Sequence, residues 1–413
     1  MGDDSHRTRT TYRFELLRAV SSGILETAGT TFLLLVAVRY FAAGATAKAV
    51  VAGAGSLGLL LSPAVVSLVS STRWSTSAAA ARVLAVGAGS FFIAFLLPGL
   101  PVFVFCGVLG MAASAAVIPL LTQMYQDNYP EKERGRMFSR AFMVRIAIAA
   151  AFSKLAGDAL DGHIERYRWL LLTFGAALAF ASFCLSRCPG QPISQDGGAH
   201  PFRAMRFVRE DPLFRRTLIC WMLMGFANLM MLPLRVEYLA NPKYHASNEA
   251  LGVGMIALLT GVIPNVARLV LSPIWGYLFD RMNFFALRVT LNVGFAIGIL
   301  TFFTSGSTAG LIAGAIVYGI SNAGGDVAWS LWVTKFAPPD RVADYMAVHT
   351  FLTGVRGVAA PLFAFLSVGH LSIGILATIC TGLILAGTAL LIPEIKLGGR
   401  GRSASVLVEE ISE

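Results

Sequence analysis

The chain has 413 residues, of which 56% are hydrophobic and only 14% are charged. A soluble domain carries about 25% charged residues, so this composition predicts a protein that faces lipid over much of its surface. The net charge of +10 is compatible with nucleic-acid binding, but Lys and Arg also collect in the cytoplasmic loops of membrane proteins, and we favour that interpretation. The five cysteines form neither a metal-ligand pattern nor a disulfide framework.

Twelve hydrophobic runs are long enough to span a bilayer, which takes about 20 helical residues. They are too long for strands and rich in Ala, Leu and Gly, which predicts an all-α integral membrane protein. The charged N-terminus lacks the small-residue cleavage site of a signal peptide, so we expect the first run to be retained. The runs cover residues 15–38, 48–71, 77–97, 101–125, 139–158, 168–187, 217–236, 251–274, 287–305, 309–333, 343–366 and 370–392.

Lys and Arg are distributed unevenly between the two sides of this predicted membrane protein. With both termini in the cytoplasm, 23 of the 33 basic residues fall on inner segments and six fall in outer loops. Because cytoplasmic loops carry an excess of Lys and Arg, this pattern predicts a multi-pass protein with both termini inside. The compact loops favour a bacterial protein of the inner (plasma) membrane.

The two halves of the chain repeat each other weakly. Three matched positions carry the repeat, at offsets of 210, 202 and 207 residues: Pro63 with Pro273, Gly23 with Gly225, and Ser114 with Ser321. An internal duplication of this kind implies two pseudo-symmetric six-helix bundles in parallel orientation. We expect an N-terminal bundle at 1–188, a cytoplasmic linker at 189–216, a C-terminal bundle at 217–394 and a cytoplasmic tail at 395–413.

The linker holds a short pattern of its own. Phe202, Met205 and Val208 recur at three-residue spacing between arginines. This spacing predicts a basic amphipathic helix on the inner membrane surface, with a solvated linker as the alternative.

A local motif follows the eighth run. Gly276 is followed after three residues by Asp280 and Arg281, and Arg288 lies further on. We expect a tight turn at Gly276, after which Asp280 and Arg281 lie in a cytoplasmic loop and Arg288 stands at the cytoplasmic start of the next run. In the matching place of the first half, Ser70 and Ser71 stand where the acid and the base would be.

With this motif, the twelve runs and the longer middle loop, nearly the whole chain resembles the major facilitator superfamily. The resemblance implies a fold of two six-helix bundles and transport by alternating access. It also implies a gating role for Gly276, Asp280, Arg281 and Arg288. The antiporter motif that some members carry in the fifth helix is absent, so no subfamily is indicated.

Five ionisable residues fall deep inside the predicted spans: Glu26, Arg145, Arg268, Asp326 and Arg356. Each costs about 2.5–3.5 kcal/mol on insertion scales, so each needs a partner, water or a ligand. In the family that the chain resembles, the helices carrying them line a central cavity. Three arginines against two acids predict a positive cavity for an anionic or carboxylate-bearing solute, with Glu26 or Asp326 as the proton-coupling acid. The alternative is structural pairing: Asp326 with Arg356, and Glu26 with Arg145 or Arg268.

Three further residues are candidates for contact with the solute. Asn228 stands where Glu26 maps in the second half, and Asn322 and Trp329 lie near Asp326 on the tenth run. Interhelical hydrogen bonding by the amides and aromatic packing by Trp329 are the alternatives.

The sequence therefore predicts a secondary active transporter that moves a small, anionic or carboxylate-bearing solute, coupled to protons or another ion. Two alternatives stay open. One is proton-coupled efflux of lipophilic or cationic compounds, and the other is a transporter-like sensor or scaffold without flux. The sequence contains no recognisable phosphate-binding loop, metal-ligand cluster or nucleophile–base set, so we expect no enzyme, cofactor or metal. The expected partners are the solute, the coupling ion and the lipid bilayer, without nucleic acid, for a chain that acts as a monomer.

Overall fold

The computed structural model describes residues 2–72, 74–192, 205–245, 249–332 and 342–398, and within these ranges the regular structure is helical. Eleven helical segments there are long and hydrophobic enough to cross a membrane. The remaining predicted span lies on α8 (Glu131–Leu160), whose many charged residues lower its hydropathy. The chain is an all-α integral membrane protein, as the composition predicts.

The first six spans build one helical bundle. Within it, α1 packs against α8 and α9, and α5 packs against α6 and α9. The helices before α8 are α1 (Gly2–Thr27), η1 (Ala28–Phe32), α2 (Leu33–Arg39), α3 (Ala45–Ala52), α4 (Ala54–Thr72), α5 (Thr76–Leu96), α6 (Leu100–Ala116) and α7 (Ile118–Asn128). After α8 come η2 (Ile164–Arg166) and α9 (Tyr167–Ser186).

The second six spans build the other bundle in the same way. Here α12 packs against α17 and α18, and α15 packs against α16 and α18. The helices are α11 (Arg206–Glu210), α12 (Pro212–Ala240), η3 (Pro242–Tyr244), α13 (Val253–Ala257), η4 (Leu258–Val262), α14 (Ile263–Arg281), α15 (Phe284–Thr304), α16 (Thr308–Leu331), α17 (Val342–Ser367), α18 (Ile373–Ala389) and α19 (Ile392–Gly398).

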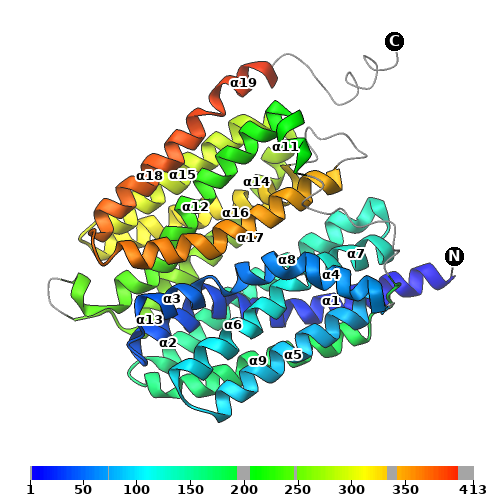
Figure 1. Ribbon diagram of the computed structural model, residues 1–413, viewed down its shortest axis with the longest axis horizontal. Helices are drawn as coiled ribbons and strands as arrows, with labels where there is room; N and C mark the ends of the chain where they lie inside the picture. The colour runs from blue at the N-terminus through cyan, green and yellow to red at the C-terminus, as the bar shows by residue number, and fades with distance from the viewer. Residues whose placement is uncertain (1, 73, 193–204, 246–248, 333–341, 399–413) are drawn as a thin grey trace.

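The two bundles lie side by side, with the N-terminal one below and the C-terminal one above in Figure 1. At the end away from the chain termini, α2 contacts α12, α3 contacts α17 and α13 contacts α8. Closer to the middle, α4 also contacts α17, and α8 contacts α14. The interface is therefore built from the first, second and fifth spans of each bundle.

One π-helical turn in each bundle lies at this interface. η1 interrupts the first span and η4 interrupts the eighth, and the two turns contact each other. The hydroxyl oxygens of Thr31 and Thr260 are 3.0 Å apart across the contact. A π turn places an extra residue in one helical turn and often marks a functional position.

The repeated glycines lie at matching helix crossings. A Cβ atom at Gly23 would stand 2.5 Å from the carbonyl oxygen of Arg145 on α8. A Cβ atom at Gly225 would overlap the guanidinium of Arg356 on α17. Each bundle thus packs an arginine-bearing helix directly against a glycine of its first span, as a duplicated fold requires.

Several boundaries differ from the sequence predictions. The expected turn at Gly276 is wrong, because α14 continues as a helix to Arg281. The turn comes at Asn283, whose Oδ1 accepts hydrogen bonds from the amides of Phe285 and Ala286 and starts α15. α12 starts at Pro212, before the predicted 217, and α19 extends beyond the predicted boundary at 394.

The linker contains α11, which covers only part of the predicted amphipathic segment. Phe202 and Arg203 lie outside the described residues. Phe207 is buried, and its ring centroid lies 5.4 Å from that of Tyr345 on α17. This helix therefore packs against the C-terminal bundle through Phe207, a residue outside the predicted hydrophobic face.

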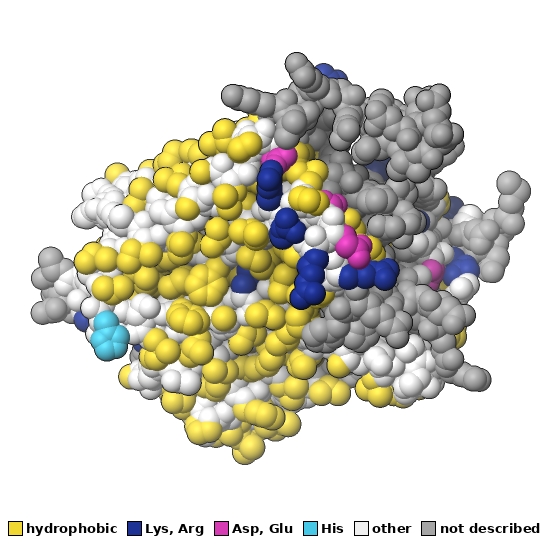
Figure 2. Space-filling model, turned by 45° about the horizontal axis from the view of Figure 1, so that its top comes forward, with side chains coloured by type: hydrophobic (Ala, Val, Ile, Leu, Met, Phe, Trp, Pro, Cys, Tyr) yellow, Lys and Arg dark blue, Asp and Glu magenta, His cyan; other side chains and the backbone are white. Residues whose placement is uncertain are grey.

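The outer surface matches a protein embedded in lipid. Figure 2 shows a broad, mainly hydrophobic face, with most of its Lys and Arg side chains gathered toward the side that carries the termini in Figure 1. Large hydrophobic side chains such as Phe105, Leu68 and Trp169 are more than half exposed in the absence of lipid.

Candidate functional site

A carboxylate at the interface is shared by the two bundles. Glu26, near the end of α1, is almost fully buried. Its Oε2 accepts a 2.6 Å hydrogen bond from Nε of Arg145 on α8, in the same bundle. Its Oε1 accepts a hydrogen bond from Nη1 of Arg268 on α14, in the other bundle. The expected pairing of Glu26 with Arg145 or Arg268 therefore occurs with both arginines at once.

Arg268 extends this network into the second bundle. Its Nε donates to Oδ2 of Asp326 on α16 at 2.5 Å, and its Nη1 also donates to Oδ1 of Asn265 at 3.2 Å. Arg268 is only 5% exposed, so the two acids balance a charge that water does not reach. We call Arg145, Glu26, Arg268 and Asp326 the central network; its two positive and two negative charges balance.

Arg145, unlike Arg268, leaves much of its guanidinium exposed and without hydrogen bonds to described residues. Its side chain is 39% exposed, and it gives only Nε to Glu26. Its two terminal amino groups make no hydrogen bond within the described part of the chain. Because a guanidinium offers five donors in a planar fork, Arg145 keeps one side of that fork open for an oxyanion.

An aromatic side chain that the sequence analysis missed lies beside both arginines. The guanidinium carbons of Arg145 and Arg268 lie 5.7 and 5.3 Å from the ring centroid of Phe142. Phe138 stacks on Phe142 with centroids 6.1 Å apart. The signal was the three-residue spacing between Phe142 and Arg145, which places both on one face of α8.

Arg356 does not belong to the central network. It is 8% exposed, and its Nη1 donates to the carbonyl oxygen of Trp221 on α12. The expectation of three arginines in one positive cavity is therefore wrong, as is the alternative pair between Asp326 and Arg356. The physical reason is Gly225, which leaves room for the guanidinium of Arg356 against α12 inside its own bundle.

The gating residues are placed differently from the expectation. Arg288 is fully buried in the second turn of α15, with its guanidinium carbon 3.7 Å from the ring centroid of Trp221, so it lies in the interior of the C-terminal bundle. Arg281 is exposed, and its guanidinium lies over the ring of Tyr277. Gly276 lies inside α14, where an added Cβ would meet nothing. The side chain of Asp280 lies outside the described residues.

The remaining candidates lie in the second bundle. Trp329 is half-buried, with its ring centroid 5.6 Å from that of His349. Asn228 lies beside Tyr318, and its buried Oδ1 has no hydrogen-bond partner in the described ranges. Asn322 is half-buried and one helical turn from Asp326. Trp329 therefore belongs to an aromatic group, while Asn228 keeps its carbonyl oxygen without a partner in the described part of the bundle.

A second set of polar contacts joins the bundles at the end away from the termini. Nζ of Lys48 lies 2.9 Å from both carboxylate oxygens of Glu237, which is fully buried. Arg39 donates to the carbonyl oxygen of Leu251, and Oδ1 of Asp161 accepts from the amide of Val253 at 2.8 Å. Sequence reasoning missed this set, because the predicted spans begin at 48 and end at 236 and so leave these charges at their edges.

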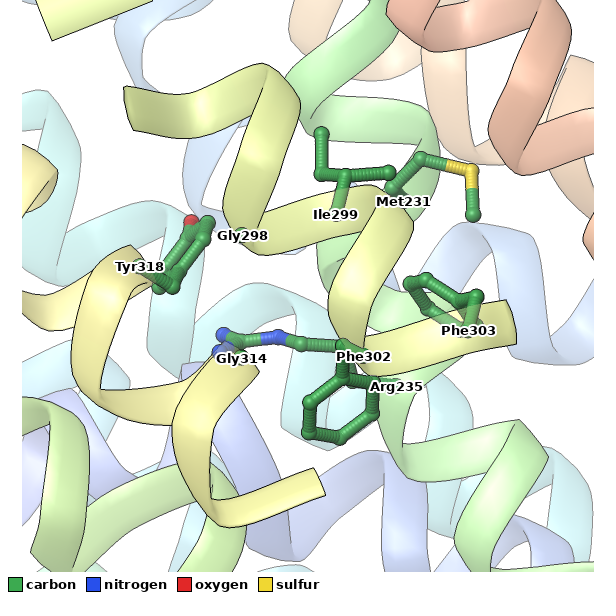
Figure 3. Close-up of a pocket in the computed structure, with 8 residues that line it drawn as sticks. All are labelled: Met231, Arg235, Gly298, Ile299, Phe302, Phe303, Gly314 and Tyr318. Atoms are coloured by element: carbon green, nitrogen blue, oxygen red, sulfur yellow. The ribbon is translucent and has the colours of Figure 1, made fainter. Parts of the chain in front are cut away.

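A small cavity lies within the second bundle near that end. Figure 3 shows Arg235 reaching toward Tyr318 between Gly314 and Phe302. The guanidinium carbon is 4.0 Å from the ring centroid of Tyr318, and the side chain is 4% exposed. Arg235 therefore lies inside the bundle near the end of the predicted span 217–236, and α12 continues past it to Ala240.

The protein is thus an integral membrane protein built from two bundles of membrane-spanning helices, with a buried charge network between them. A family model described as the Major Facilitator Superfamily matches residues 17–361. The chain belongs to the major facilitator superfamily and is a secondary transporter that works in a membrane on a small-molecule solute.

Solved structures share this fold over nearly the whole chain. A nucleoside transporter, NupG in a D323A mutant form, has a TM-score of 0.76 at 13% identity, covering 93% of this chain and 99% of its own. A D-xylose-proton symporter gives 0.64 at 17% identity, with 94% and 96% covered. The human organic anion transporter MFSD10 (TETRAN) gives 0.61 at 16% identity, with 94% and 99% covered. A comparison with curated proteins found no match.

Proposed function

We propose that the protein transports a small anionic or carboxylate-bearing solute, coupled to protons, and that the solute binds at the central network. The observation that supports this is the open side of Arg145, whose two terminal amino groups have no partner among the described residues while Nε holds Glu26. A carboxylate docked there makes charge-assisted hydrogen bonds in the bidentate geometry that arginine favours.

Glu26 supplies the proposed coupling. While it is ionised, its charge balances Arg145 and Arg268, so an anionic solute has to compete with it. Protonation of Glu26 removes that competition: Arg145 is then left to the solute, while Arg268 keeps Asp326 and can offer the donor that Glu26 held. Solute and proton therefore favour each other's binding, which is the requirement for coupled transport.

Replacement of Glu26 by the solute as a partner of the arginines also links solute binding to motion of the bundles. Arg145 and Glu26 belong to the first bundle and Arg268 to the second, so a protonated Glu26 holds the bundles together less strongly. A solute bound between Arg145 and Arg268 restores the link in a new geometry. We propose that the bundles, divided near residues 189–216, rock about this point in a single chain acting as a monomer.

Orientation follows from the basic residues. With both termini in the cytoplasm, the Lys48–Glu237 contact faces the outside, and the structure is closed on that side. We place the protein in the inner membrane of a bacterium because its loops are compact. Opening to the outside then requires Lys48 and Glu237 to separate.

The test uses protein reconstituted in vesicles that carry an internal pH indicator. Carboxylates, uncharged sugars and nucleosides, and organic cations are added one at a time to the outside. We expect carboxylates to drive proton movement in the parent, and we expect this signal to be lost in Arg145→Gln and in Glu26→Gln. Arg82→Gln, a change at an exposed arginine outside the network, should keep the signal. Proton movement with organic cations alone would overturn the proposal.

One observation favours a second candidate. The central network carries two positive and two negative charges, and such a balanced site also suits an uncharged polar solute. The similar structures include a nucleoside transporter and a xylose symporter, both named for uncharged solutes. The same panel separates the two, because nucleosides or sugars would then give the signal in place of carboxylates.

A further inference from the structure

A second group of buried charged and aromatic residues lies inside the C-terminal bundle, apart from the central network. Arg288 on α15 lies over the ring of Trp221 on α12, and Arg356 on α17 donates to the carbonyl oxygen of Trp221. His349 lies between Trp221 and Trp332, with ring centroids 5.2 and 5.0 Å away. We call these five residues the arginine–tryptophan cluster.

The cluster holds two positive charges that no described acid balances. Arg288 and His349 are fully buried, and Arg356 is 8% exposed. Nε and Nη1 of Arg288, Nε of Arg356 and both ring nitrogens of His349 are buried without a hydrogen-bond partner in the described ranges. The contact between Arg288 and Sδ of Met224, at 3.5 Å, is a weak one. Buried charges in proteins are paired or bind a ligand, so this arrangement requires a negative partner.

The N-terminal bundle shows how the same place is completed when the chain supplies that partner. There Arg18 pairs with Glu15 at 2.6 Å, and the hydroxyl of Tyr125 donates to Glu15 at 2.7 Å. The repeat offset of 202 residues aligns Glu15 with Thr217, and the offset of 207 aligns Tyr125 with Trp332. The C-terminal bundle therefore has a threonine at the position of the carboxylate.

We propose that the arginine–tryptophan cluster binds a small oxyanion, a carboxylate or inorganic phosphate, between Arg288 and Arg356. The anion takes the place that the carboxylate of Glu15 has in the other bundle. Unused donors of both guanidinium groups and of His349 supply its hydrogen bonds. Arginine forks suit oxyanions better than other ligands, because they donate in pairs within one plane. The proposal does not depend on the identity of the transported solute.

Thermal unfolding of the purified full-length protein tests the proposal directly. The protein is kept in a HEPES buffer, whose sulfonate is bulky, and receives phosphate or formate at constant ionic strength. A ligand that binds only the folded protein raises Tm, and we expect a rise of roughly 3 °C or more at saturation. If neither phosphate nor formate raises Tm above the HEPES control, the proposal is wrong.

Single substitutions show which residues bind the anion. The rise should be lost or clearly reduced in Arg356→Gln and Arg288→Gln, and it should persist in Arg82→Gln, which removes an exposed guanidinium that lies 3.9 Å from the ring centroid of Trp74. It should also persist in Arg145→Gln. A rise that is lost in Arg145→Gln but kept in Arg356→Gln would place the anion at the central network. That result would overturn this proposal and leave the proposed function standing.

A third variant covers the case in which the arginine variants do not fold. Thr217→Glu copies Glu15 into the second bundle at the repeat-related position. We expect this variant to melt higher than the parent in HEPES and to lose the response to phosphate and formate. An unchanged anion response in Thr217→Glu, together with an unchanged response in whichever arginine variant folds, would contradict the proposal.

Discussion

Glu26 has more effect on stability than a surface carboxylate, because it neutralises a buried arginine from the other bundle. In Glu26→Gln, Arg268 keeps Asp326 while Arg145 loses its acid. Removing one partner of a buried ion pair costs about 3–5 kcal/mol, and we expect the free energy of unfolding to fall by roughly 3 kcal/mol. Thermal or denaturant unfolding in detergent measures this change.

Glu165 is the matched control for Glu26, since it lies in η2, is exposed and makes a surface contact with His163. Glu165→Gln should leave the unfolding curve unchanged. Equal effects of the two substitutions would show that the carboxylate of Glu26 does not hold Arg268.

Lys48 and Glu237 form a pair whose members should behave as one unit. Glu237 is fully buried and also accepts a hydrogen bond from Asn241. Lys48→Met leaves that carboxylate without its cation and should destabilise by about 3 kcal/mol. The double variant Lys48→Met with Glu237→Gln should recover at least about 1 kcal/mol of this loss, because no unpaired charge stays buried. A double-mutant cycle of unfolding free energies measures the coupling, and additive losses would contradict the pairing.

At the residue scale, the sequence predicted part of the set of buried charges, and it left the choice among their partners open. A charge inside a hydrophobic run has a high free-energy cost in a membrane. This criterion alone singles out Glu26, Arg145, Arg268, Asp326 and Arg356 from the sequence. Pairing depends on how helices from different bundles face each other, and sequence periodicity carries no information about that. Arg268 is buried, but its ion pairs with both Glu26 and Asp326 could not be read from the sequence.

At the element scale, the crossing of α1 and α8 depends on Gly23. A Cβ atom there would stand 2.5 Å from the carbonyl oxygen of Arg145 and 2.8 Å from Cβ of Ile148, and a backbone oxygen cannot rotate away. Gly23→Ala should therefore push α8 outward and lower the free energy of unfolding by about 1–3 kcal/mol. It should also weaken solute-driven proton movement, because α8 carries Arg145.

Gly89 on α5 provides the control for this glycine. An added Cβ at Gly89 meets nothing within 4 Å, and alanine favours a helix over glycine by about 1 kcal/mol. Gly89→Ala should leave the melting temperature unchanged or raise it. If Gly23→Ala also left the melting temperature unchanged, the close crossing of α1 and α8 would be refuted.

The number of membrane-spanning helices was predictable, because each span needs a long hydrophobic run. The twelve runs correspond to the long helices of the structure. Element ends were less predictable. Gly276 and Arg235 lie near the ends of hydrophobic runs, yet α14 and α12 continue past them. Helices extend beyond the hydrophobic stretch wherever packing inside the bundle supports them, as the burial of Arg235 and Glu237 shows.

At the scale of the whole molecule, transport by rocking requires the two bundles to separate at the end away from the termini. Thr31 in η1 and Thr260 in η4 contact each other across that interface and are both buried. Their hydroxyl oxygens are 3.0 Å apart, so two cysteines at these positions need to approach by only about 1 Å to form an S–S bond of about 2.05 Å.

We therefore expect the double variant Thr31→Cys with Thr260→Cys to form a disulfide on mild oxidation and to lose solute-driven proton movement. Reduction should restore the movement, because the bond breaks without any other change. The single variants serve as controls and should respond to neither treatment, since the five natural cysteines are buried and unpaired. Full proton movement in the oxidised, cross-linked protein would refute rocking about this interface, because the contact between η1 and η4 would then persist through the transport cycle.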